Sequence, residues 1–128
     1  MSGDSRVWIL RGHGMTATDV VNRYTDAFHS GDMETAASLL SEDFQFHGPL
    51  MQAESRADFF EKMAGFNLVA ESVVHRMIEH GTTVARVFDF VISEPVSTTV
   101  PMAEWMEVEN GRITKAWLYY DSAAFPTG

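Results

Sequence analysis

The hydrophobic pattern of the chain changes its period near residue 65. Before this point apolar residues recur every three or four positions, which is the spacing of one face of an amphipathic helix. After it they fall into extended runs rich in β-branched and aromatic residues. The pattern predicts helices in the first half and strands in the second, and such segregation indicates an α+β fold.

Three helices are predicted before residue 65. The first begins at Thr16-x-x-Asp19, which resembles a capping box, and ends at Ser30-Gly31 because glycine tolerates the left-handed conformation of a helix end. A second, short helix begins at Asp32. The third begins at Ser55-x-x-Asp58 and ends at Gly65.

Strands are predicted around and after these helices. A short strand at residues 44–47 is halted by Gly48-Pro49, where the chain must turn. Asn110-Gly111 is the strongest hairpin signal, because both residues accept positive φ. Four long strands are expected to form an antiparallel meander, near residues 67–79, 82–94, 97–109 and 112–121.

The length of these strands predicts the shape of the sheet. A long sheet twists and curls, so we expect a cone on three N-terminal helices, with a concave face that lines a pocket. The strand at 82–94 is apolar on both faces and needs cover on both. Because three helices cover only one face, we expect the other face to form a homodimer.

Composition narrows the class of protein. The 128 residues suit one domain, and 45% hydrophobic with 21% charged residues is typical of globular chains. The absence of cysteine excludes disulfides, thiolate nucleophiles and cysteine-bound metal. A net charge of −9 argues against nucleic acid and anionic membranes as partners. We expect a cytoplasmic protein.

The first residues differ from the rest of the chain. Residues 1–15 are predicted to be a flexible leader, followed by one domain over residues 16–128; the alternative is that Trp8 and Leu10 pack onto the body or a neighbouring subunit. The sequence contains no phosphate-binding, dinucleotide-binding, zinc-protease or serine-hydrolase motif. We therefore expect no cofactor and no metal.

Five short segments carry a resemblance to a known superfamily. They are Val20-Val21-Asn22-Arg23-Tyr24, Ser30-Gly31-Asp32-Met33, Ser41-Glu42-Asp43-Phe44, Glu109-Asn110-Gly111-Arg112-Ile113 and Trp117-Leu118-Tyr119-Tyr120-Asp121. Together they resemble the nuclear-transport-factor-2-like superfamily, the cone-shaped fold of ketosteroid isomerases and SnoaL-like polyketide cyclases, over about residues 16–124. The resemblance implies the fold but no single activity, because this superfamily contains isomerases, cyclases, hydrolases, binding modules and assembly domains.

The resemblance also points to individual residues. Tyr24 in Arg23-Tyr24 matches the oxyanion-hole tyrosine of ketosteroid isomerases, and Glu104 falls at their second donor, a protonated aspartic acid. Their general base, an aspartate before a proline, falls at Gly48, which cannot take a proton. This departure argues against steroid isomerisation. The alternatives are a Tyr24 packed in the core and a Glu104 that faces solvent or a dimer contact.

Three further residues are candidate proton-transfer groups. His47 lies beside the vacant base position, although strand alternation points it to the other face unless a bulge intervenes. Asp89 is a pocket acid, or a charge paired across the dimer or discouraging a wrong strand pairing. Asp121 lies near the position of the acid–base aspartate of SnoaL-like cyclases, and a shift of one residue decides which way it faces.

These observations predict an apolar pocket for a hydrophobic small molecule. As an enzyme, the protein would be an isomerase or cyclase that moves a proton next to a carbonyl. Tyr24 and Glu104 would stabilise the enolate oxygen, and His47, Asp89 or Asp121 would move the proton. The alternatives are a non-catalytic ligand-binding protein and an assembly domain whose cone is filled by its own side chains.

Overall fold

The computed structural model describes residues 15–126 of the chain. The predicted leader lies almost wholly outside these residues, as do Trp8 and Leu10. The elements, in chain order, are α1 (Ala17–Ser30), α2 (Met33–Ser38), β1 (Leu40–His47), β2 (Gln52–Ala53), α3 (Arg56–Met63), η2 (Ala64–Phe66), β3 (Val69–His80), β4 (Thr83–Glu94), β5 (Thr98–Glu109), β6 (Arg112–Tyr119) and η3 (Ser122–Ala124).

The predicted helix starts are confirmed. Thr16 and Asp19 form a reciprocal capping box at α1, and Gly31 closes this helix with a φ of 83°. The side chains of Asp32 and Ser55 cap α2 and α3. The predicted end of α3 is wrong in detail: the α-helix stops at Met63, and the chain continues through Gly65 in a 3-10 turn.

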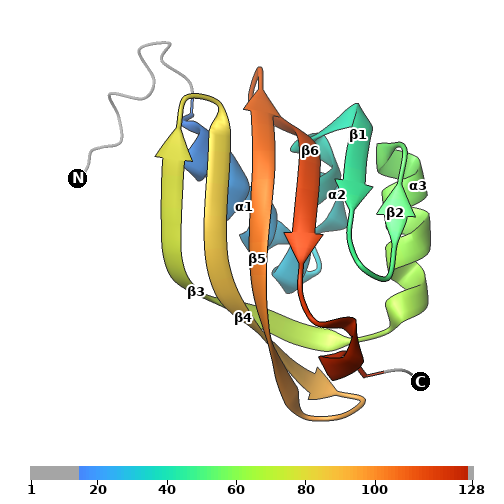
Figure 1. Cartoon of the computed structure of the whole chain (residues 1–128). Helices are drawn as coiled ribbons and strands as arrows, with labels where there is room; N and C mark the ends of the chain where they lie inside the picture. The colour runs from blue at the N-terminus through green and yellow to red at the C-terminus, as the bar shows by residue number, and fades with distance from the viewer. Residues whose placement is uncertain (1–14, 127–128) are drawn as a thin grey trace.

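The strands form one curled, unclosed sheet of six strands in the order β2-β1-β6-β5-β4-β3. The long strands are antiparallel to their neighbours, whereas β1 runs parallel to β6 (Figure 1). The short strand predicted at 44–47 begins earlier, at Leu40, because its first residues also pair with β6. The α+β class predicted from the sequence is confirmed.

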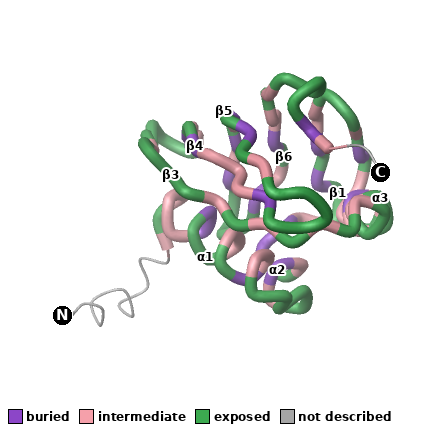
Figure 2. Tube along the Cα trace, turned by 90° about the horizontal axis from the view of Figure 1, so that it is seen from below, coloured by how far each residue is buried: buried purple, intermediate pink, exposed green. Residues whose placement is uncertain are grey.

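The helices cover one face of the sheet, which we call the inner face. Along β4 the side chains of Val84, Phe88 and Ile92 are buried beneath this cover, whereas Val87 on the opposite, outer face is exposed. Figure 2 shows the same contrast between strands, with β3 exposed along most of its length at the edge of the sheet. Within the described residues, no helix is long and apolar enough to cross a membrane.

Two hydrophobic clusters fill the inner side. The larger joins α1 and α3 to β1, β5 and β6, with Val20, Leu40 and Phe59 among its buried members. The smaller gathers around Phe88 of β4 and includes Phe125, just after η3. Members of both clusters line one cavity, which is the candidate functional site.

Candidate functional site

A cavity of about 130 Å³ opens between the helices and the inner face of the sheet. Its wall is mostly aromatic and thioether side chains from both hydrophobic clusters. The phenylalanines of this wall are Phe28, Phe44, Phe46, Phe59, Phe66, Phe88, Phe90 and Phe125. A few polar side chains interrupt this surface, and all of them except Tyr120 lie where α1 faces β3, β4 and β5.

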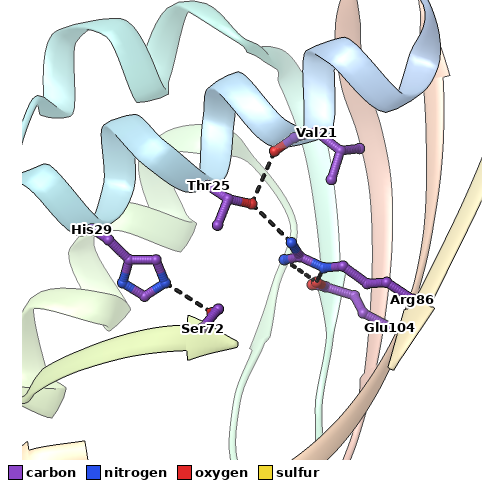
Figure 3. Close-up of polar contacts among 6 residues, drawn as sticks. All are labelled: Val21, Thr25, His29, Ser72, Arg86 and Glu104. Atoms are coloured by element: carbon purple, nitrogen blue, oxygen red, sulfur yellow. Dashed lines mark hydrogen bonds and ion pairs between the residues drawn. The ribbon is translucent and has the colours of Figure 1, made fainter. Parts of the chain in front are cut away.

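Arg86 and Glu104 form an ion pair on the cavity wall (Figure 3). Arg86 of β4 and Glu104 of β5 are directly opposite in register, so both side chains point inward. The guanidinium donates from Nε and Nη2 to Oε1 of Glu104, at 3.1 and 2.7 Å. Its Nη1 donates to Oγ1 of Thr25 at 2.9 Å, and Thr25 donates in turn to the Val21 carbonyl.

Arg86 is only 7% exposed, so its charge needs this partner. The guanidinium also lies 4.7 Å from the centre of the Phe88 ring, a cation–π contact. Both of its bonds to Glu104 fall on Oε1, so Oε2 of Glu104 remains for another partner. An inward Glu104 was one alternative that the sequence left open, and in the structure Glu104 lies on the cavity wall.

Tyr24 lies on α1 beside this ion pair and lines the cavity. Burial raises the pKa of its hydroxyl far above the ordinary value, and the nearby Glu104 carboxylate acts in the same direction. The hydroxyl therefore stays protonated. No hydrogen bond joins this hydroxyl to another of the residues 15–126.

A second polar pair, His29 and Ser72, lines the cavity further along α1 (Figure 3). Nε2 of His29 lies 2.9 Å from Oγ of Ser72 on β3. The imidazole packs between the Phe28 ring, at 5.8 Å, and the Phe90 ring, at 6.2 Å. Burial lowers the pKa of His29 below its ordinary value.

His29 was not predicted to be a site residue from the sequence. A signal was present, because His29 follows Val21 and Thr25 at intervals of four and therefore shares a helix face with them. The partner could not be found in this way, because Ser72 comes from a strand 43 residues later.

The structure places the three proposed proton-transfer residues outside the cavity. His47 lies on the outer face of β1, where its ring stacks on Trp117 at 5.5 Å, because no bulge reverses the alternation at Gly48. Asp89 also lies on the outer face and accepts a hydrogen bond from His75 of β3 at 2.8 Å. Asp121 is exposed and caps η3 through the amide of Ala123.

Gly48, where the ketosteroid isomerases have their general base, has little room for a side chain. A Cβ atom on Gly48 would lie 2.9 Å from Cε2 of Phe46, closer than such atoms approach in proteins. The Phe46 ring thus occupies the space into which a carboxylate at residue 48 would project. Among the described residues, no group of three or more His, Asp or Glu side chains could hold a metal ion.

Comparisons with known proteins agree with this architecture. The family model described as "SnoaL-like domain" matches residues 21–116. None of the curated proteins compared matches the sequence. The fold is similar to that of an NTF2-like protein of unknown function from Cytophaga hutchinsonii, at 25% identity and a TM-score of 0.76, covering 88% of this chain and 96% of that one.

Two further solved structures share the fold. One is a proposed polyketide cyclase of Pseudomonas putida KT2440, 24% identical, with a TM-score of 0.75 over 88% of this chain and 96% of that chain. The other is a proposed ketosteroid isomerase of Kribbella flavida, 18% identical, with a TM-score of 0.73 over 88% of this chain and 82% of that chain.

Proposed function

The chain belongs to the SnoaL-like domain family, and on this premise we propose that its cavity binds a hydrophobic small molecule bearing a carbonyl group. We further propose that it catalyses a cofactor-independent proton transfer at the carbon next to that carbonyl, as an isomerase or cyclase does. The neighbours described as polyketide cyclase and ketosteroid isomerase support this class of reaction.

One observation carries the proposal: a tyrosine hydroxyl and a guanidinium lie together on the wall of a mostly apolar cavity. Tyr24 has a protonated hydroxyl there, and the buried Arg86 guanidinium lies nearby. Donors held in place within an apolar site stabilise a developing oxyanion far more strongly than water does. A carbonyl oxygen that becomes an enolate oxygen is the group that this part of the cavity suits.

Glu104 has a different role here from the one that the resemblance implied. As the partner of Arg86 it accepts hydrogen bonds, and an ionised carboxylate cannot donate one. We therefore propose that Glu104 positions Arg86. The hydrogen bond to the substrate oxygen comes from Tyr24.

The size of the cavity limits the ligand. A cavity of about 130 Å³ is comparable to the roughly 150 Å³ engineered apolar cavities that hold benzene. A single ring with one oxygen function is accommodated without change, and a larger molecule requires the aromatic wall to move.

A second candidate function is non-catalytic ligand binding. Gly48 and the Phe46 ring that fills its neighbourhood favour it, because the base position of the ketosteroid isomerases is lost. An assembly domain with a filled cone has less support, since the cavity is open and Trp105 lies on the outer face.

We also propose that the protein is a homodimer through the outer face of the sheet. Large apolar side chains stand exposed there, including Ile78 and Tyr119, each 60% exposed, and Trp105 at 49%. Monomeric proteins rarely expose a contiguous apolar patch of this kind.

The binding of p-nitrophenol tests the cavity. Its phenolate resembles an enolate in shape and charge, and its colour reports which protonation state is bound. We expect binding of the phenolate, and Tyr24→Phe should weaken it about tenfold or more, since a hydrogen bond to a charged group contributes about 1.5–3 kcal/mol.

Tyr119→Phe is the matched control, because it removes the same hydroxyl from an exposed tyrosine outside the cavity. It should leave the dissociation constant unchanged. Absence of p-nitrophenol binding by the wild-type protein, or an equal loss in both variants, would contradict the proposed oxygen site.

A further inference from the structure

The proposed oxygen site leaves open which group moves the proton. Five titratable side chains line the cavity: Tyr24, His29, Arg86, Glu104 and Tyr120. Arg86 and Glu104 are paired with each other. Burial raises the pKa of both tyrosines, so neither hydroxyl loses its proton near neutral pH. His29 remains as the group that can gain and lose a proton near neutral pH.

His29 also shares one cavity with the oxygen site. It follows Thr25, the partner of Arg86, by four residues, so the two side chains lie on the same face of α1. Ser72, the hydrogen-bond partner of His29, lines the same cavity as Tyr24. A ligand that fills this cavity of about 130 Å³ therefore lies against both the oxygen site and the His29–Ser72 pair.

The surroundings of His29 favour the neutral imidazole. Burial is the largest effect and lowers the pKa, and the Arg86 guanidinium acts in the same direction. The Ala70 carbonyl, Glu71 and Asp26 oppose it, but the net shift is downward. At neutral pH the ring is therefore unprotonated and has a nitrogen that accepts a proton.

The contact of Nε2 with the Ser72 hydroxyl defines the path of the proton. At 2.9 Å the two atoms are hydrogen-bonded, and both residues line the cavity. Figure 3 shows the imidazole of α1 directed toward Ser72 on β3, separate from the ion pair. A hydroxyl can accept one proton while it donates another, so Ser72 can connect a substrate to His29.

We propose that Ser72 and His29 form the proton relay of this cavity, an inference that rests on the proposed function. The C–H bond next to the carbonyl breaks, and its proton passes to Oγ of Ser72 while the Ser72 proton passes to Nε2 of His29. The electron pair of the C–H bond forms the carbon–carbon double bond of the enolate. The carbonyl π pair moves to the oxygen that Tyr24 holds, and the reverse transfer returns a proton to carbon.

Hydrogen–deuterium exchange of cyclohexanone, a single-ring ketone of the size that the cavity admits, tests this relay without knowledge of the natural substrate. The ketone is incubated with the protein in D2O, and loss of its α-proton signal is followed by NMR. We expect the wild-type protein to accelerate exchange. Ser72→Ala and His29→Gln should each lower the protein-catalysed rate at least about 100-fold, the lower end of what acid–base catalysis contributes.

Three comparisons separate a relay from a structural role. Ser72→Thr keeps the hydroxyl and should retain most of the exchange rate. His80→Gln is the matched control for His29→Gln, because His80 is exposed at the β3–β4 turn, and it should have no effect. The wild-type rate should be constant above the pKa of His29 and fall as the pH drops below it, since protonated imidazole accepts no proton.

The outcomes distinguish failure of the relay from failure of the proposed proton-transfer function. If the wild-type protein accelerates exchange and Ser72→Ala does so equally well, the relay is overturned and the proton-transfer function stands. If the wild-type protein binds p-nitrophenol but does not accelerate exchange, both the relay and the proton-transfer function are overturned. Ligand binding alone would then remain.

Discussion

Arg86 connects three elements of the site through one side chain. Its guanidinium bonds Glu104 on β5 and Thr25 on α1, and it lies over the ring of Phe88 on its own strand. The bond to Thr25 ties the helix that carries Tyr24 and His29 to the sheet. The buried guanidinium thus holds α1 against β4 and β5, the two strands that carry the ion pair.

The dependence of Arg86 on Glu104 gives a prediction for stability. Glu104→Met leaves a buried, uncompensated guanidinium, and we expect the free energy of unfolding to fall by about 3–5 kcal/mol. The double variant Arg86→Met/Glu104→Met removes both charges and should regain most of this loss, because apolar replacements of buried ion pairs are often neutral. Urea unfolding of the wild-type protein and the variants measures both values.

A cost below about 1 kcal/mol for Glu104→Met would contradict the buried pair. A double variant as unstable as Glu104→Met would contradict it too. The unpaired Arg86 charge would then not be the cause of the instability.

At this scale the sequence predicted part of the site. Tyr24 and Glu104 were identified through resemblance, and both line the cavity. His29 and Ser72 were missed because their pairing depends on how α1 packs across β3, and no local pattern encodes that contact.

At the scale of elements, the ends of the four long strands were predicted within about two residues, because Gly81, Pro95 and Asn110-Gly111 mark the turns between them. What the pattern could not decide is the face of a residue near a strand end. Asp121 falls two residues past the end of β6 and caps η3. His47 ends β1 on the outer face.

The turn after β6 closes the cavity through one aromatic ring. Phe125, which follows η3, packs on Phe66 at 5.9 Å, on Phe90 at 6.2 Å and on Tyr120 at 5.3 Å. Phe125 is buried and belongs to the wall of the cavity. The C-terminal segment therefore limits the size of the ligand.

Phe125→Ala should enlarge the cavity and let it accept a two-ring ligand. We expect the affinity for 2-naphthol, measured by its fluorescence, to rise relative to that for p-nitrophenol. The free energy of unfolding should fall by about 3–5 kcal/mol, as for other buried phenylalanines.

Phe60→Ala is the control, because Phe60 packs against the larger core cluster and is not part of the cavity wall. It should reduce stability without changing the ratio of the two affinities. A Phe125→Ala protein with the wild-type ratio would show that the C-terminal segment does not limit ligand size.

At the scale of the whole molecule, the two faces of the sheet are linked by strand alternation. Arg86 and Glu104 point into the cavity, while their neighbours Val87 and Trp105 point outward. Among residues 15–126, Figure 1 shows no helix over this outer face, and a hollow there is lined by Ile78, Trp105 and neighbouring side chains. A second copy packed on this face would brace the same strands that hold the ion pair.

The proposed dimer predicts the effect of a charge placed on the outer face. Sedimentation velocity of the wild-type protein should give twice the mass of one chain, and Val87→Lys should give a monomer, because a buried lysine without a partner is costly. Val96→Lys is the matched control, since Val96 is a similarly exposed valine in the β4–β5 turn, and this variant should stay dimeric. A monomeric wild-type protein, or a Val87→Lys protein that remains a dimer, would place any partner of this chain elsewhere. If the dimer braces the strands of the ion pair, Val87→Lys should also weaken p-nitrophenol binding, although residue 87 never touches the cavity.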